Sequence, residues 1–268
     1  MYNLKYKGPK EDSKIWLLAF FFTRKDIRGD ILNRRRYNGT IAALIFIMVL
    51  MSVRDNLANP GNWIYDKLVI LPGIILGLSF HEFAHGFASY KLGDPTPKAQ
   101  GRVTLNPMAH IDPIGFVALL LCGFGWGKPV QIDTRYYKKP RRDEIIVGFA
   151  GVTMNLIIAV IFMLIFKLIF VISPTFLLSN LGGVVVDVIK NVIVINLVLM
   201  VFNLLPVPPL DGFGIITNIF DLTKYDWYYK LYNNGFLILT VLILFNVTSF
   251  ILGPAVSGIY SFLANIIL

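Results

Sequence analysis

Long apolar runs that hold almost no charge constrain the fold of this chain more than any other feature. The run Ile145–Phe166 has 22 residues and no charged side chain. A helix needs about 20 apolar residues to cross the hydrocarbon core of a bilayer. The chain is 56% hydrophobic and 15% charged, whereas soluble proteins carry about 25% charged residues. The sequence therefore predicts an all-α, polytopic membrane protein.

About six transmembrane helices are expected. The first four cover Gly39–Val53, Leu68–Leu92, Ile145–Phe166 and a stretch from about Val184 to the motif FNLLPVPPLDG at 202–212. Three prolines in that motif must end the fourth helix, because proline removes a backbone donor and clashes with the preceding turn. Asp211 is therefore expected on an extended or kinked segment at the membrane edge. Gly253-Pro254 is expected to divide the uncharged tail from Leu231 into one clear span and a shorter one.

The region between the second and third spans, Asp94–Asp143, is expected to be irregular because prolines and glycines interrupt it repeatedly. Val103–Leu105 and Val130–Ile132 are candidates for short strands. The apolar run Phe116–Phe124 is too short to cross and is predicted to be a re-entrant or half-buried element. Irregular backbone at membrane depth requires protein or a water-filled cavity around it.

Basic residues in the loops orient the chain. The segment before the first span is rich in Lys and Arg, and nine more lie between Lys91 and Arg142, whereas the loop 173–183 has none. Positive residues favour the cytoplasmic side. We therefore expect residues 1–37 to be a cytoplasmic, interfacial segment and residues 38–268 to be a membrane-embedded domain. The net charge of +9 is explained by topology, so no nucleic-acid partner is expected.

Three ionisable groups lie inside the second span and point to chemistry. Between Leu68 and Ser89 the only ionisable side chains are His81, Glu82 and His85, and such groups are costly at membrane depth. On a helix the two histidines lie one turn apart on one face. This HExxH spacing lets both imidazoles bind one zinc ion, with Glu82 as general base for a water. The alternative, a packed helix with satisfied histidines, would bury three polar groups for no gain.

A third protein ligand is needed to complete a catalytic zinc site, and two residues are candidates. Asp211 follows the fourth span on the same cytoplasmic side as the second span's histidines. His110 is the rival, since imidazole is the commonest metal ligand. Its neighbours Asp112 and Pro113 indicate a turn, which favours a supporting or gating role for His110.

Four motifs resemble those of the site-2 protease family of intramembrane zinc metalloproteases, in particular its small bacterial members without PDZ or CBS domains. In chain order they are HEFAHGFASYKLGD, NPMAHIDPIG, GWGKPVQ and NLLPVPPLDG. The resemblance implies that His81, His85 and Asp211 bind Zn²⁺, that Glu82 is the general base, and that Asn203 helps to stabilise the oxyanion. One departure is Val152, which follows Ala150-Gly151 where the family often has proline.

The expected function is therefore proteolysis of transmembrane protein substrates within or near their membrane segments, known as regulated intramembrane proteolysis. The enzyme would lie in the cell membrane in contact with the lipid bilayer, with its active site in the cytoplasmic half. One alternative is a metal- or proton-handling transporter, which also explains intramembrane His and Glu but not the HExxH arrangement. A catalytically dead scaffold is a further alternative, and the intact Glu82 opposes it.

Overall fold

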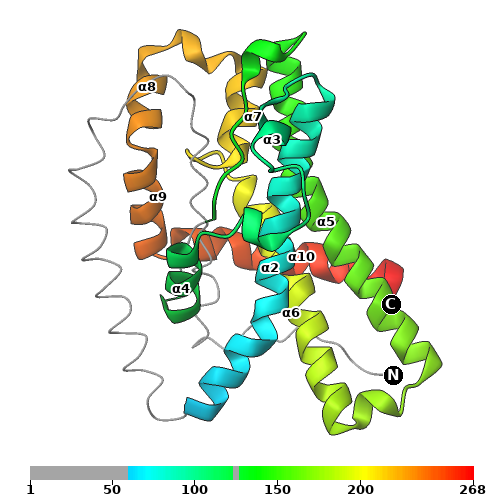
Figure 1. Cartoon of the computed structure of the whole chain (residues 1–268). Coiled ribbons are helices and arrows are strands. Elements are labelled where there is room, and N and C mark those ends of the chain that lie inside the picture. The colour runs from blue at the N-terminus through cyan, green and yellow to red at the C-terminus, as the bar shows by residue number, and fades with distance from the viewer. Residues whose placement is uncertain (1–59, 123–126) are drawn as a thin grey trace.

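Three long apolar helices form the centre of the molecule and pack against one another. They are α2 (Pro60–Lys91), α5 (Pro140–Ile172) and α6 (Asn180–Asn203), which lie together in Figure 1. The computed structural model describes residues 60–122 and 127–268. The predicted interfacial segment 1–37 and the predicted span Gly39–Val53 lie outside these residues.

Two glycines allow α2 and α6 to approach closely. A Cβ added at Gly73 would lie 2.8 Å from Cδ1 of Ile195, and one added at Gly77 would lie 2.6 Å from Cδ1 of Leu199. Neither distance leaves room for a methyl group. The small-xxx-small spacing predicts such an approach in membrane helices, and the structure confirms it.

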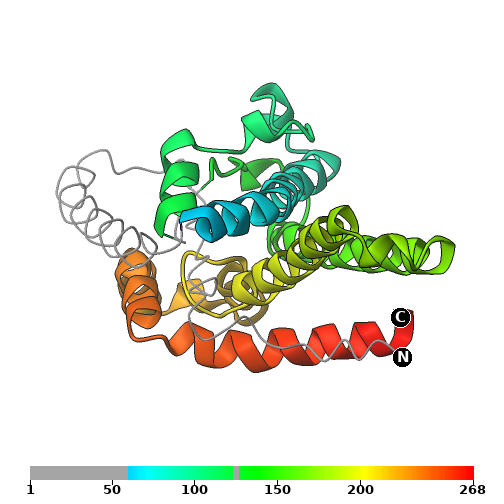
Figure 2. The same ribbon diagram turned by 90° about the horizontal axis from the view of Figure 1, so that it is seen from below.

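Shorter helices surround the central three. They are α3 (Thr96–Ala99), α4 (Pro113–Cys122), α7 (Asp211–Phe220), α8 (Asp226–Asn233), α9 (Gly235–Leu244) and the longer α10 (Val247–Ile267). Single 3-10 turns occur at Pro107–Ala109, Thr134–Tyr136, Phe176–Leu178 and Leu222–Lys224. Figures 1 and 2 show α10 running across the central helices, with α8 and α9 to one side.

Among the described residues, α2, α5, α6 and α10 are long and apolar enough to cross a membrane. The chain is thus a multi-pass, helical membrane protein, as its composition predicts. The second span extends further towards the N-terminus than the expected Leu68–Leu92, because α2 already includes residues 60–67.

The tail differs from the prediction in where it breaks. Asn246 adopts a left-handed conformation between α9 and α10, and α10 then continues through Pro254. The expected division at Gly253-Pro254 is therefore wrong. Membrane helices tolerate an internal proline, whereas the left-handed backbone at Asn246 cannot be part of a right-handed helix. α9 has only 10 residues, so the long apolar helix of the tail is α10.

No strand forms in residues 60–122 or 127–268, so the expected short strands at Val103–Leu105 and Val130–Ile132 are wrong. The described residues hold one isolated antiparallel bridge, between Ile111 and Gly127. The backbone N–H of Val130, which a strand would use in a ladder, donates instead to the Glu82 carboxylate. α4 is 10 residues long, too short to cross, and whether it re-enters the membrane stays a prediction.

Candidate metal centre

His81, Glu82 and His85 lie on α2, in the half nearer its carboxyl end, and all three side chains are buried. The expected helical HExxH arrangement is therefore present. One turn of helix separates the two histidines, and their Nε2 atoms lie 3.0 Å apart. The two imidazoles therefore present their Nε2 atoms to one point.

Asp211 is the first residue of α7, so the expected extended or kinked position is wrong. The chain turns back tightly after α6: a Cβ at Gly212 would lie 2.5 Å from the carbonyl carbon of Leu204. α7 then packs along the first half of α5, where Gly148 leaves room for Ile215. This packing aims the Asp211 carboxylate at α2.

The far end of α7 is tied to α5 by charge. Asp221 ends the helix in a left-handed conformation and pairs with Arg141 at 2.6 Å and with Lys224 at 2.5 Å. The Lys224 ammonium, together with Arg141, holds the pKa of the Asp221 carboxyl below its usual value. Asn218 of α7 also donates to Glu144 of α5 at 3.1 Å. These contacts fix the register in which α7 presents Asp211.

The three side chains converge with the spacing of a metal site. Oδ2 of Asp211 lies 3.2 Å from Nε2 of His81 and 3.2 Å from Nε2 of His85. Two donors that each lie 2.0–2.1 Å from one tetrahedral zinc are about 3.3 Å apart. Among the described residues these three form the group of His, Cys, Asp and Glu side chains that could hold a metal ion.

The hydrogen bonds made by Nδ1 of each imidazole show which ring nitrogen is available to bind a metal. Nδ1 of His85 lies 2.7 Å from the carbonyl oxygen of Val147, and Nδ1 of His81 lies 2.7 Å from Oδ1 of Asn155. Both partners are acceptors, so each Nδ1 carries a proton, and Nε2 is the nitrogen of each ring that can bind a metal. Two imidazole nitrogens and a carboxylate oxygen within 3.2 Å of one another are stabilised when a cation lies between them. The donor set therefore fits a zinc ion, which takes imidazole and carboxylate ligands.

α5 packs against both helices that carry these groups, and Gly151 lets α2 approach it closely. A Cβ at Gly151 would collide with Nε2 of His85 and would lie 2.6 Å from Cε1 of His81. Both imidazoles thus contact α5 at Gly151, where any side chain would collide with them.

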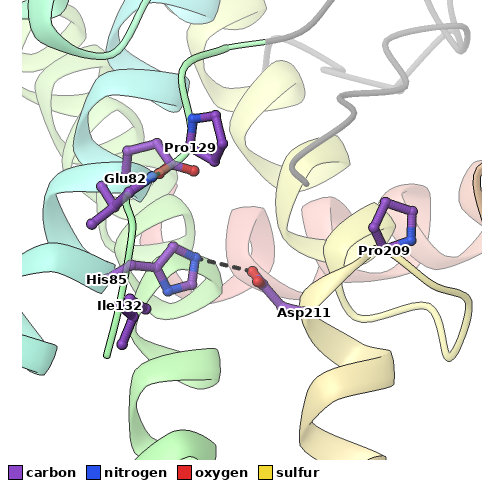
Figure 3. A pocket seen from close by; sticks show the side chains of 7 residues that line it. Glu82, His85, Pro129, Ile132, Pro209 and Asp211 are labelled. Atoms are coloured by element: carbon purple, nitrogen blue, oxygen red, sulfur yellow. Dashed lines mark hydrogen bonds and ion pairs between the residues drawn. The ribbon is translucent and has the colours of Figure 1, made fainter. Parts of the chain in front are cut away.

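Glu82 lies beside this group and faces a small cavity (Figure 3). Its Oε2 accepts a 2.6 Å hydrogen bond from the backbone N–H of Val130. The space open to the centre of a water molecule is about 20 Å³, enough for one water. The cavity is lined by Glu82, His85, Pro129, Val130, Ile132, Pro209 and Asp211.

A buried carboxylate positions the segment that contributes Val130. Asp94, just beyond α2, accepts hydrogen bonds from the Ser89 hydroxyl and from the backbone N–H of Asp133, each at 2.8 Å. The Arg135 guanidinium beside Asp133 lowers the pKa of that carboxyl below its usual value. The segment that reaches Glu82 is therefore fastened to the end of the helix that carries Glu82.

The other two predicted site residues lie outside the metal-facing group, which consists of His81, His85 and Asp211. His110 is fully buried, and its Nε2 donates to the carbonyl of Thr104 at 2.8 Å. Asn203 is buried at the end of α6, where its Nδ2 donates to the carbonyl of Leu199 at 2.9 Å. Of the two candidates for the third ligand, the structure thus brings Asp211 and not His110 to the histidines.

Sequence reasoning gave no role to three residues that support the site: Gly151, Asn155 and Asn196. The asparagines had a detectable signal, because amide side chains inside apolar spans are usually at helix contacts. Asn196 also lies seven residues before Asn203, on the same helical face. At Gly151 the available signal was the resemblance of Ala150-Gly151 to the family motif, because glycine on its own is common in membrane helices.

Comparison with known proteins agrees with this geometry. The model of peptidase family M50 matches residues 69–245. "Putative zinc metalloprotease YwhC" of Bacillus subtilis (strain 168) is 36% identical over 208 residues, which are 74% of this chain and 91% of that protein. "Putative zinc metalloprotease Rip2" of Mycolicibacterium smegmatis is 27% identical over 59% of this chain and 60% of its own length. The Mycobacterium tuberculosis protein of the same description is 28% identical over 56% of each chain.

No solved structure matches this chain significantly. The family match covers α2, α5, α6 and α7, which together hold every residue of the metal-facing group. The motifs quoted from the sequence fall within the same region. The chain belongs to peptidase family M50.

Proposed function

We propose that the chain is an intramembrane zinc metalloprotease in which His81, His85 and Asp211 bind the metal and Glu82 is the general base. The observation that carries this proposal is the convergence of three donor atoms within 3.2 Å of one another beside a buried glutamate. The relatives described as zinc metalloproteases support the choice of metal. The family supports membrane proteins as substrates.

Bound at these three residues, zinc would supply a Lewis acid that acidifies a water and polarises a peptide carbonyl. Glu82 accepts the proton of the attacking water and passes it to the leaving amine. The Val130 N–H holds one carboxylate oxygen, so the other is free to face the cavity. The cavity has room for one water, and its lining by Pro129 and Pro209 would place a substrate carbonyl beside these two residues.

Two further residues take supporting roles in this proposal. Asn203 has a second amide hydrogen beyond the one bound to Leu199, and it would donate that hydrogen to the oxyanion. Removal of a comparable donor costs other enzymes about 3 kcal/mol. His110 would hold the segment 104–110 beside the substrate path and gate entry.

The position of the site along α2 supports cleavage within or near a transmembrane segment. His81 is ten residues from the end of α2 at Lys91, about 15 Å at the rise of an α-helix, or half of a hydrocarbon core about 30 Å thick. We propose that the Lys91 end is cytoplasmic, with six spans in all and a cytoplasmic N-terminus. The active site then lies in the cytoplasmic half of the cell membrane.

Glu82→Gln tests the catalytic assignment. The purified wild-type protein should hold about one zinc per chain and cleave a model transmembrane substrate in detergent or proteoliposomes. The variant should keep the zinc and cleave about 10²- to 10⁴-fold more slowly, because it loses a proton acceptor and no ligand. Metal analysis and gel-based cleavage are the measurements. A variant that cleaves at the wild-type rate would refute the role of Glu82.

Thiol labelling tests the orientation. Lys138 and Leu178 are exposed on loops at opposite ends of the central helices. With Cys122 replaced by Ser, a cysteine at 178 should react with a membrane-impermeant maleimide on intact cells, and a cysteine at 138 should react only after lysis. The reverse pattern would place the active site in the outer half of the membrane.

A further inference from the structure

Two buried asparagines connect His81 to the neighbouring helices. Oδ1 of Asn155 on α5 lies 2.7 Å from Nδ1 of His81. Nδ2 of Asn155 donates at 3.0 Å to the carbonyl of Gly77 and at 3.0 Å to Oδ1 of Asn196 on α6. Nδ2 of Asn196 donates in turn to the carbonyl of Val192 at 2.8 Å. Neither asparagine has any exposed surface, so water does not replace any of these bonds.

Backbone carbonyls, which can only accept, determine which atom donates in each of these hydrogen bonds. Val192 O can only accept, so Asn196 presents Nδ2 to it, and this turns Oδ1 of Asn196 toward α5. Gly77 O and that Oδ1 are both acceptors, so Asn155 presents Nδ2 to them, and this turns Oδ1 of Asn155 toward His81. His81 must then carry a proton on Nδ1, which leaves Nε2, 3.2 Å from Oδ2 of Asp211, as the nitrogen that can bind a metal.

We propose that Asn155 and Asn196 form a positioning relay that holds His81 in its metal-binding tautomer and so sets the affinity of the site for zinc. The inference rests on the proposed role of His81 as a ligand. Partners of this kind orient metal-bound histidines in other proteins, and their loss typically costs 10- to 100-fold in metal affinity. His85 needs no relay, because a backbone carbonyl holds its Nδ1 directly.

The opposing explanation is that the two amides only join α5 to α6 as interhelical hydrogen bonds. Substitutions at Asn155 distinguish the two roles. Leu has nearly the shape of Asn, so in a joining role Asn155→Leu would leave zinc binding unchanged, and Asn155→Asp would be the damaging variant because it buries a charge. In a positioning role the order reverses, since Asp still accepts the His81 proton and Leu does not.

The test measures zinc affinity of purified protein by competition with a chromophoric chelator. We expect Asn155→Leu to bind zinc about 10- to 100-fold more weakly and Asn155→Asp to stay closer to the wild type. Asn196→Leu should weaken binding less, because Gly77 still orients Asn155. The double Leu variant should be no weaker than Asn155→Leu alone, because Asn196 acts through Asn155.

Asn191→Leu is the matched control. Asn191 also lies on α6 and donates to the carbonyl four residues before it, at 2.8 Å, as Asn196 does. We expect its zinc affinity to equal that of the wild type. The absorption bands of the Co²⁺-loaded protein should change in Asn155→Leu and not in Asn191→Leu.

Zinc binding by Asn155→Leu at wild-type affinity, in a protein that elutes and melts like the wild type, would overturn the relay and leave the ligand assignment intact. Additive losses in the double variant would overturn the role of Asn196. A wild-type protein that binds no zinc would overturn both the relay and the proposed function.

Discussion

Purified Asp211→Asn protein is expected to contain almost no zinc and to cleave no substrate. The change replaces an anionic ligand by a neutral amide and leaves two imidazoles, whereas catalytic zinc sites have three protein ligands. The loss of affinity should exceed the 10- to 100-fold that is typical of residues that only support a ligand. Metal analysis after dialysis against a weak chelator measures it. Wild-type zinc content in this variant would exclude Asp211 from the ligand set.

His110→Ala is the control for this experiment, since His110 is the rival third ligand and also a buried histidine. It should keep its zinc and lose only part of its activity, because the structure places it outside the group formed by His81, His85 and Asp211. The variant loses one hydrogen bond to Thr104, so size-exclusion elution and thermal unfolding should be recorded with the metal content. If His110→Ala lost its zinc while remaining folded, the ligand set would have to be rewritten.

Gly151→Ala is expected to displace both imidazoles at once. The added methyl group would occupy space held by Nε2 of His85 and Cε1 of His81, and overpacking of this kind costs about 1–3 kcal/mol. If the rings move to relieve the clash, zinc binding weakens by about 10- to 100-fold, at about 1.4 kcal/mol for each factor of ten. Zinc competition and cleavage of the model substrate should decline together.

Gly258→Ala provides the comparison for this second variant. Gly258 also lies inside a long helix, α10, and a Cβ there would meet no atom within 4 Å. Alanine favours helix over glycine by about 1 kcal/mol, so Gly258→Ala should melt at the same temperature as the wild type or slightly higher, with full zinc. A Gly151→Ala protein that behaved in the same way would mean that the histidines do not depend on contact with α5.

The parts of the site that a local pattern specifies were predictable from the sequence. The HExxH spacing needs only one helical turn to bring two histidines together, and the hydrophobic length of α2 ensures that this turn is helical. Gly73 and Gly77 similarly predicted a close helix contact, because nothing but helix packing explains paired small residues in a span. Asp211 was predictable as a candidate, since the motif places it beside the helix end on the same side of the membrane as the histidines.

Features that depend on packing between distant segments were not predictable in the same way. Asp211 begins a helix because α7 has α5 to pack against, and three prolines before it gave no sign of that. Val130 does not form a strand because its N–H binds a carboxylate 48 residues earlier in the chain. The tail breaks at Asn246 and not at the expected Gly253-Pro254. Residue propensities alone do not show whether a helix ends at an asparagine or continues through a proline.

The hydrogen bond between Glu82 and Val130 has a consequence for how the site withstands mutation. Its donor is a backbone atom, as is the acceptor that holds His85, so the side chains at positions 130 and 147 can drift without removing either contact. Proline is the exception at 130, because it has no N–H. Substitutions that the surrounding packing tolerates should therefore leave the orientation of the proposed base and of one proposed ligand unchanged. His81, in contrast, is held by the side chains of Asn155 and Asn196, which a single substitution can remove. These two positions are therefore where mutation can change the affinity of the site for zinc.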